Sequence, residues 1–120
     1  LKQAGCSLTE KTTFDPYVDR VARIREASSY EADQLVAKDP AYGEIVCRCE
    51  EVSEAEIVGA IQRGHTTLDG IKFFTRARAG RCQGGFCTYK ILKILMRETG
   101  MSAEEITKRG GESKLLVGRL

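Results

Sequence analysis

Two stretches decide how this chain folds: Cys47-Arg48-Cys49 and Cys82-Gln83-Gly84-Gly85-Phe86-Cys87. Glycines stand close to both, and they allow the backbone to turn sharply. Four thiolates that folding brings together form a closed, soft ligand set, and such sets bind iron–sulfur clusters or structural zinc. Incidental or disulfide-bonded cysteines are the simpler interpretation, but two close pairs at these intervals favour a metal centre. We therefore predict that its ligands are Cys47, Cys49, Cys82 and Cys87.

The spacing within each pair leaves the metal open between zinc and iron–sulfur. Zinc knuckles usually have the form Cys-x2-4-Cys, which the second pair fits and the Cys-x-Cys of the first pair does not. The common ferredoxin spacings match neither pair. A disulfide between Cys47 and Cys49 would close a very small, strained ring, so an oxidised pair is a poor interpretation. Gly84 and Gly85 allow backbone N–H groups to approach a sulfur closely, which suits either kind of centre.

The residues around both pairs resemble a known family, the bacterioferritin-associated-ferredoxin-like [2Fe-2S] domain. The run from Gly70 to Cys87 resembles its second half, and Ile45-Val46-Cys47-Arg48-Cys49-Glu50 resembles its first half. The Cys-x4-Cys form of the second pair is similar to that of the C-terminal domain of anaerobic-type, FAD-dependent glycerol-3-phosphate dehydrogenases. The tail from Ile106 to Leu116 resembles theirs too. The chain departs from the pattern at Phe73-Phe74, where such proteins typically have a basic pair, and at Thr88-Tyr89, where Gly-Pro often follows the last cysteine.

This resemblance implies that the four cysteines bind a [2Fe-2S] cluster, and it favours this cluster over zinc. It implies an electron-transfer domain of a dehydrogenase that acts on glycerol 3-phosphate or a related small metabolite. Residues 1–41 are then a connector from a preceding FAD domain that this chain lacks, and residues 42–120 are the [2Fe-2S] domain with a C-terminal tail. We expect electrons to pass from flavin to a further iron–sulfur subunit or to quinone, in the cytoplasm or at the inner membrane face through partner subunits.

Composition fits one small domain. The chain has 120 residues, of which 42% are hydrophobic and 30% charged, as in soluble globular proteins. We find no apolar run of membrane-spanning length and no secretory signal, so the five cysteines indicate a reducing compartment. A net charge of +2 and few aromatic residues argue against nucleic-acid binding. The chain begins at Leu1 rather than at methionine, so we expect a piece of a longer protein.

Apolar periodicity, glycine stops and capping boxes predict short helices and an all-α fold. The expected helices cover 30–38, 53–64, 68–76, 85–97 and 102–108. Each cysteine pair then lies in a loop just before a helix, and helix N-termini favour a nearby anion. The prediction is a small bundle of short helices with two cysteine-bearing loops.

Other residues carry weaker signals. We expect Cys6 to be a structural or incidental thiol, His65 to be an exposed loop residue, and Glu50 and Glu51 to be solvated. The segment 71–97 contains seven cations and no acid, which predicts either a solvated basic face or a device that stabilises a reduced cluster. These cations are Lys72, Arg76, Arg78, Arg81, Lys90, Lys93 and Arg97.

We identify no catalytic residue, so any substrate would be held by another domain. Two alternatives to electron transfer remain open: a structural zinc module that docks a protein partner, and a metallochaperone-type domain.

Overall fold

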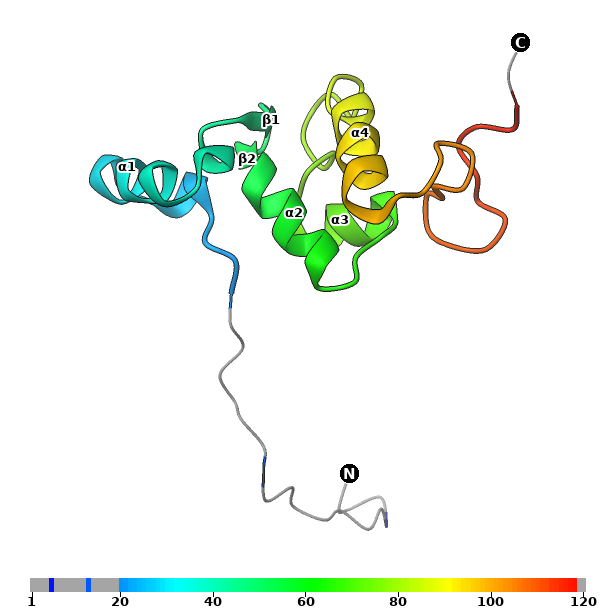
Figure 1. The fold of residues 1–120 in the computed structure, drawn as a ribbon, viewed down its shortest axis with the longest axis horizontal. Coiled ribbons are helices and arrows are strands. Elements are labelled where there is room, and N and C mark those ends of the chain that lie inside the picture. The colour runs from blue at the N-terminus through cyan, green and yellow to red at the C-terminus, as the bar shows by residue number, and fades with distance from the viewer. Residues whose placement is uncertain (1–4, 6–12, 14–19, 119–120) are drawn as a thin grey trace.

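The computed structural model describes residues 20–118 together with Gly5 and Thr13. Figure 1 shows a helical body with a small strand pair beside it. The elements in chain order are η2 (Ile24–Glu26), α1 (Ser29–Lys38), η3 (Pro40–Tyr42), β1 (Ile45–Cys47), β2 (Val52–Ser53), α2 (Glu54–Gln62), α3 (Leu68–Thr75) and α4 (Thr88–Thr99). Within the described part of the chain, no helix is long and apolar enough to cross a membrane.

The all-α prediction is wrong, because β1 and β2 form a two-stranded antiparallel sheet. Ile45 pairs with Ser53 and Cys47 with Val52, with an irregularity between the two pairs. The chain must reverse direction after Cys47 to enter α2, and strand pairing satisfies the backbone groups of that reversal. Glu51 completes the turn with a left-handed φ of 51°. These strands are too short to be recognised from periodicity, and the fold is mixed α/β.

Four of the expected helices form, but the fifth, over 102–108, does not. Residues 100–118 are turns with one isolated bridge between Thr107 and Lys114. The backbone carbonyls of Thr107 and Lys108 accept hydrogen bonds from the N–H groups of Leu68 and Asp69, at 3.2 and 2.7 Å. These carbonyls therefore cap the first turn of α3, whose N–H groups have no partner within the helix. An extended backbone at 106–108 makes this capping possible where a helix would use the same carbonyls internally.

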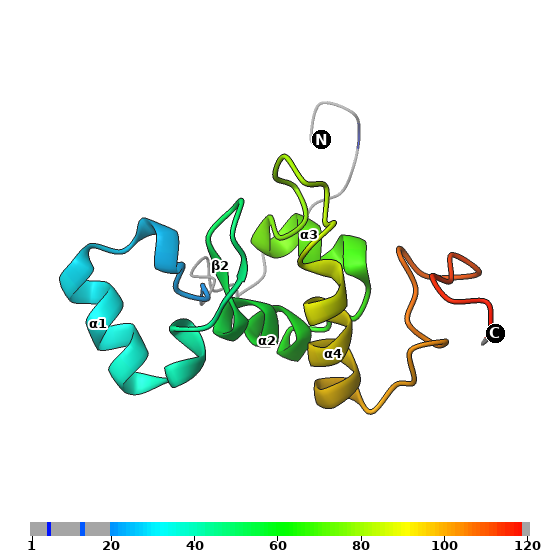
Figure 2. The ribbon, with the colours of Figure 1, turned by 90° about the horizontal axis from the view of Figure 1, so that it is seen from above.

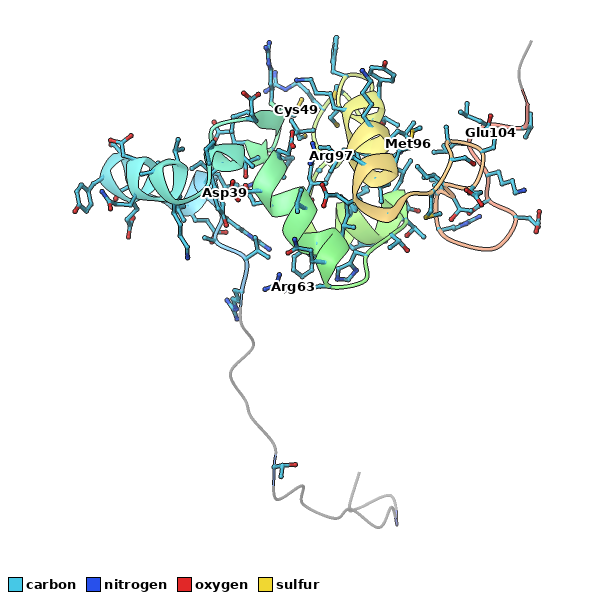
Figure 3. The ribbon with its side chains drawn as sticks, viewed as in Figure 1. Asp39, Cys49, Arg63, Met96, Arg97 and Glu104 are labelled. Atoms are coloured by element: carbon cyan, nitrogen blue, oxygen red, sulfur yellow. The ribbon has the colours of Figure 1, made fainter. Side chains whose placement is uncertain are left out.

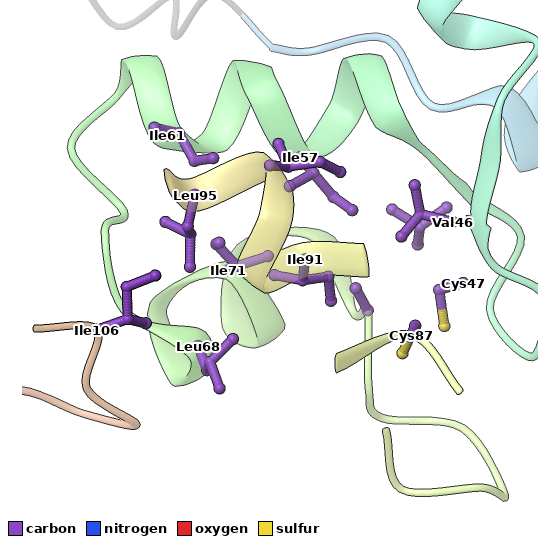
Figure 4. Packing of buried hydrophobic residues seen from close by; sticks show 13 residues of the cluster. Val46, Cys47, Ile57, Ile61, Leu68, Ile71, Cys87, Ile91, Leu95 and Ile106 are labelled. Carbon is purple, nitrogen blue, oxygen red and sulfur yellow. The ribbon is translucent and has the colours of Figure 1, made fainter. Parts of the chain in front are cut away.

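The core lies between α2, α3 and α4 (Figure 4). Its fully buried side chains come from all three helices and from the C-terminal segment: Ile57, Leu68, Ile71, Ile91, Leu95 and Ile106. Cys47 and Cys87 belong to the same cluster of buried residues and lie side by side at one end of it. The core thus holds the two chain segments that carry the cysteines at a defined separation.

The segment before α1 packs onto this core, whereas α1 does not. A Cβ atom at Gly59 of α2 would lie 2.7 Å from Val21 Cγ2, so the segment 20–22 fits closely against α2. Arg23 donates to the carbonyl of Phe74 at 3.3 Å. Helix α1 has no buried residue and lies away from α4 (Figure 2). The proposed boundary between residues 41 and 42 stays a prediction.

Two capping boxes of the same kind allow a matched test of what the core requires. Ser53 and Glu56 cap α2 and are buried, whereas Ser28 and Glu31 cap the exposed α1. We expect Ser53→Ala to destabilise the protein by about 1–2 kcal/mol, because a buried cap is lost. Ser28→Ala should change the stability by less than about 0.5 kcal/mol. Thermal unfolding followed by circular dichroism measures both, and equal losses would contradict the assignment of α1 to the periphery.

Candidate metal centre

The structure brings the two predicted cysteine motifs together across the sequence. The Sγ atoms of Cys49 and Cys82 are 3.6 Å apart. Cys47 and Cys87, both almost fully buried, interact with one another at the end of the core. Each of these two spatial contacts therefore joins one thiol of the first motif to one thiol of the second. All four line a single cleft of about 470 Å³, which Val46, Arg48, Phe86 and Lys90 complete.

The four thiols are arranged as an inner and an outer pair. Cys47 and Cys87 form the inner pair, while Cys49 is exposed and Cys82 half-buried. All four are free thiols rather than disulfides. Among the described residues no group of three or more His, Cys, Asp or Glu side chains is close enough to hold one metal ion. The thiol contacts thus form two pairs, and Cys82 of the outer pair also acts on Cys87 of the inner pair.

Backbone N–H groups surround the sulfur of Cys82. The N–H of Gly84 is the main cause that lowers the pKa of this thiol, followed by the N–H of Phe86 and the thiol of Cys49. Burial, and then the neighbouring Cys47, raises the pKa of Cys87 to about 11. The glycine-rich loop therefore supplies donors to a thiolate, as its sequence predicts. Cys82 is therefore the thiol whose ionisation the loop favours, whereas burial opposes the ionisation of Cys87.

Gly80 is required by the close approach of the two cysteine loops. A Cβ atom at this position would collide with Cβ of Cys49. Gly84 has a left-handed φ of 90°, and a Cβ there would lie 2.7 Å from Thr88 Oγ1. Both glycines are buried. They let one backbone lie directly against the other loop and against the start of α4.

The collision at Gly80 leads to a prediction. Gly80→Ala should push the loop of Cys49 away from that of Cys82, with a strain of about 1–3 kcal/mol typical of overpacking, and should abolish or strongly reduce metal uptake. Gly85→Ala is the matched control, since Gly85 is exposed, has an ordinary φ, and its Cβ would meet only the carbonyl of Cys82 at 3.3 Å. Metal content after reconstitution measures the effect. Full metal content in Gly80→Ala would show that the loops do not need this contact.

Arg78 connects the second cysteine loop to α3 and α4. Its Nε donates to Thr88 Oγ1 at 3.1 Å, and Thr88 in turn donates to the carbonyl of Gly84 at 2.6 Å. Its guanidinium lies 3.7 Å from the carboxylate of Asp69, and its backbone N–H donates to the thiol of Cys87. The Arg78 side chain is only 12% exposed. Arg81, which is next to Cys82 in sequence, is exposed instead. Arg78 is therefore the cation that is built into the site.

We expect Arg78→Gln to loosen the loop, because a buried charged hydrogen bond is typically worth about 1.5–3 kcal/mol. Amide hydrogen exchange over 82–88 should accelerate roughly tenfold or more, since about 1.4 kcal/mol corresponds to a factor of ten. Loss of a nearby cation should also lower the reduction potential of a bound cluster. Arg81→Gln is the control, and it should leave exchange almost unchanged. Equal effects of the two substitutions would mean that Arg78 has no special role.

Glu50 belongs to the site although its local sequence does not indicate this. It was expected to be solvated, but its side chain is only 13% exposed and accepts from Arg76 Nε at 2.8 Å and from Arg25 at 3.3 Å. The hydrogen bond from Arg76 is the main cause that lowers the pKa of this carboxyl. Glu50 thus ties the first cysteine loop to the end of α3 and to the segment before α1. No local signal could reveal this, because both partners are far away in sequence.

The structure also shows the surroundings of the other single residues for which the sequence made a prediction. His65 is half-buried rather than exposed, and its ring stacks on Phe74 with centroids 4.7 Å apart. Glu51 is exposed, as expected. Cys6 lies outside the described residues. The four predicted cysteines line the described cleft, and their role as metal ligands stays a prediction.

Comparison with known proteins decides the family. Residues 45–97 match the model of the BFD-like [2Fe-2S] binding domain. This segment belongs to that family. The match contains both cysteine motifs, Gly80 and most of α4, so the resemblance seen in the sequence is confirmed. The family is defined by the binding of a [2Fe-2S] cluster, a cofactor that transfers electrons.

Several curated proteins are similar to this chain. A glycerol 3-phosphate dehydrogenase from Caloramator mitchellensis is 42% identical over 120 residues, which cover 98% of this chain and 25% of that protein. The anaerobic glycerol-3-phosphate dehydrogenase subunit A1 of Haloferax volcanii is 39% identical over 54 residues, 45% of this chain and 9% of that protein. Hydrogen cyanide synthase subunit HcnB of Pseudomonas aeruginosa is 39% identical over 56 residues, 47% of this chain and 12% of that protein.

The chain therefore spans a quarter or less of the length of these relatives. They are longer polypeptides, named as dehydrogenases and as a synthase subunit, of which the matched region is one part. No solved structure matches the chain.

Proposed function

We propose that this chain is the [2Fe-2S] electron-transfer part of an FAD-dependent glycerol-3-phosphate dehydrogenase, with Cys47, Cys49, Cys82 and Cys87 as cluster ligands. The observation that carries the proposal is the pairing of thiols across the two motifs inside one cleft. When bound, the cluster would accept and release single electrons. The residues of this chain hold it and limit its contact with water.

The donor set fits a two-metal cluster. A dinuclear cluster with four cysteine ligands needs two thiolates for each iron, and the cleft offers two pairs. The 3.6 Å between the sulfurs of Cys49 and Cys82 is close to the edge of a tetrahedron with metal–sulfur bonds of about 2.3 Å, roughly 3.8 Å. A single zinc ion would also accept thiolates at this separation. The match to the [2Fe-2S] family is what favours iron–sulfur over structural zinc.

The surroundings of the two pairs suit electron transfer. The inner thiols are shielded by the core, which lowers the local dielectric and keeps solvent from half of the site. The outer thiol of Cys49 is exposed, so the same site reaches the protein surface. Arg78 contributes positive charge from within the fold. A negatively charged centre would thus be held firmly on one side and accessible on the other.

Substrate oxidation belongs, in this proposal, to the part of the polypeptide that this chain does not include. The relative that aligns over nearly the whole chain, named glycerol 3-phosphate dehydrogenase, is about four times as long. We propose that an FAD domain in the remaining part oxidises the substrate, and that residues 1–41 connect it to the cluster domain. The cluster would then relay electrons one at a time from flavin to a downstream acceptor.

Ligation can be tested with the chain itself. After anaerobic reconstitution we expect two irons and two acid-labile sulfides per chain, as a [2Fe-2S] cluster requires by definition, with visible absorbance that dithionite bleaches. Replacing any one of the four ligands by serine should remove most of this absorbance, and Cys6→Ser should not. A colourless protein with one zinc per chain would overturn the cluster in favour of a structural metal. A full cluster in Cys49→Ser, or its loss in Cys6→Ser, would overturn the ligand assignment.

A further inference from the structure

One exposed aromatic side chain, Phe86, lines the cysteine cleft, and a second, Tyr89, follows it closely in sequence. Phe86 immediately precedes Cys87 and is 86% exposed, and Tyr89, at the start of α4, is 64% exposed. A large apolar side chain that stays in water next to a functional site marks a contact surface, because aromatic residues supply much of the binding energy of protein interfaces.

The charges around these aromatics are positive. Arg48 and Lys90 line the cleft, and no carboxylate lines it in the part of the chain that the structure describes. Lys93 continues the pattern, with its Nζ 4.6 Å from the centre of the Tyr89 ring. Both Lys90 and Lys93 are exposed. We call this surface the cysteine face; it comprises Arg48, Phe86, Tyr89, Lys90 and Lys93.

Two carboxylates near this face form ion pairs, whereas the exposed Glu44 lines a neighbouring cavity together with Lys90 and Lys93. Glu50 is paired with Arg25 and Arg76, and Glu54 lies 2.7 Å from Arg97. In the described part of the chain the cations of the cysteine face form no ion pair, and Lys93 contacts the ring of Tyr89. The face therefore combines apolar anchors with positive charge, and its complement is an acidic surface with an apolar centre.

We infer that the cysteine face is the docking surface for an acidic electron-transfer protein. The inference rests on the proposed function, because the exposed Cys49 would bring the cluster to this face. Positive charge would steer the acidic partner, and Phe86 would anchor it over the outer thiol pair. One electron crosses in each encounter. With a flavin hydroquinone anion as donor, the donor becomes the neutral semiquinone and the oxidised cluster becomes reduced, and no proton moves.

The molecule offers a matched control for the aromatic anchor. Phe73 is 83% exposed, nearly as much as Phe86, but it lines another cavity together with Arg63. Figure 3 shows Cys49 near the start of α2 and Arg63 at the far end of that helix. Lys38, at the end of the peripheral helix α1, is an exposed cation that can serve as the control for Lys90.

The test measures electron transfer from flavodoxin hydroquinone, an acidic protein probe, to the reconstituted chain by stopped-flow absorbance. We expect the second-order rate constant to fall as ionic strength rises from low to physiological values. Phe86→Ser should lower it about fivefold or more, as removal of an interface anchor does. Lys90→Gln should lower it about threefold at low salt, with the difference shrinking at high salt. Phe73→Ser and Lys38→Gln should stay within about twofold of the wild type.

Two further measurements keep the result unambiguous. The midpoint potential and visible spectrum of each variant are recorded, and rates are compared only between variants with equal potentials, so that a change in driving force is not taken for a docking effect. A rate constant that is independent of salt, or that falls equally in Phe86→Ser and Phe73→Ser, would overturn the docking surface. Failure of the wild-type chain to take up a cluster would instead overturn the proposed function.

Discussion

The contact between two loops that lie far apart in sequence is the constraint on which the rest of this structure depends. The loop of Cys49 lies directly on the backbone at Gly80, where a single methyl group would collide with the Cys49 side chain. In this arrangement each thiol of one motif meets a thiol of the other. The strand pair, the helix packing and the charged contacts around the loops all serve to hold this approach.

The core and the site are built as one unit. Cys47 is the last residue of β1, and Cys87 immediately precedes α4, so both inner thiols are placed by elements whose apolar side chains fill the core. Glu50 adds an ion-pair link from the first loop to α3, and Arg78 links the second loop to α3 and α4. Bound metal would join the same two loops, so its binding free energy would contribute directly to folding.

The inner thiols are buried and the outer thiols lie nearer the surface, so the site is open on one side only. One side of the cleft is closed by the core, and the other opens between cations and exposed aromatic rings. A centre in this position is protected from solvent on one side while its other side stays within reach of a partner. The described residues thus form a site suited to electron exchange at a surface.

Much of this protein could be predicted from local sequence. The Cys-x-Cys and Cys-x4-Cys motifs indicated a metal centre and the family, and Ser53 and Ser28 with their glutamates marked the starts of α2 and α1, because such signals act over only a few residues. The tertiary structure alone decided the pairing of Cys49 with Cys82, the role of Gly80, the ion pairs of Glu50 and the buried position of Arg78. It also decided that the 106–108 backbone caps α3 instead of forming a helix, and that β1 pairs with β2. Each of these depends on which distant segments meet, and that is determined by how the apolar faces of the three helices pack rather than by any local pattern.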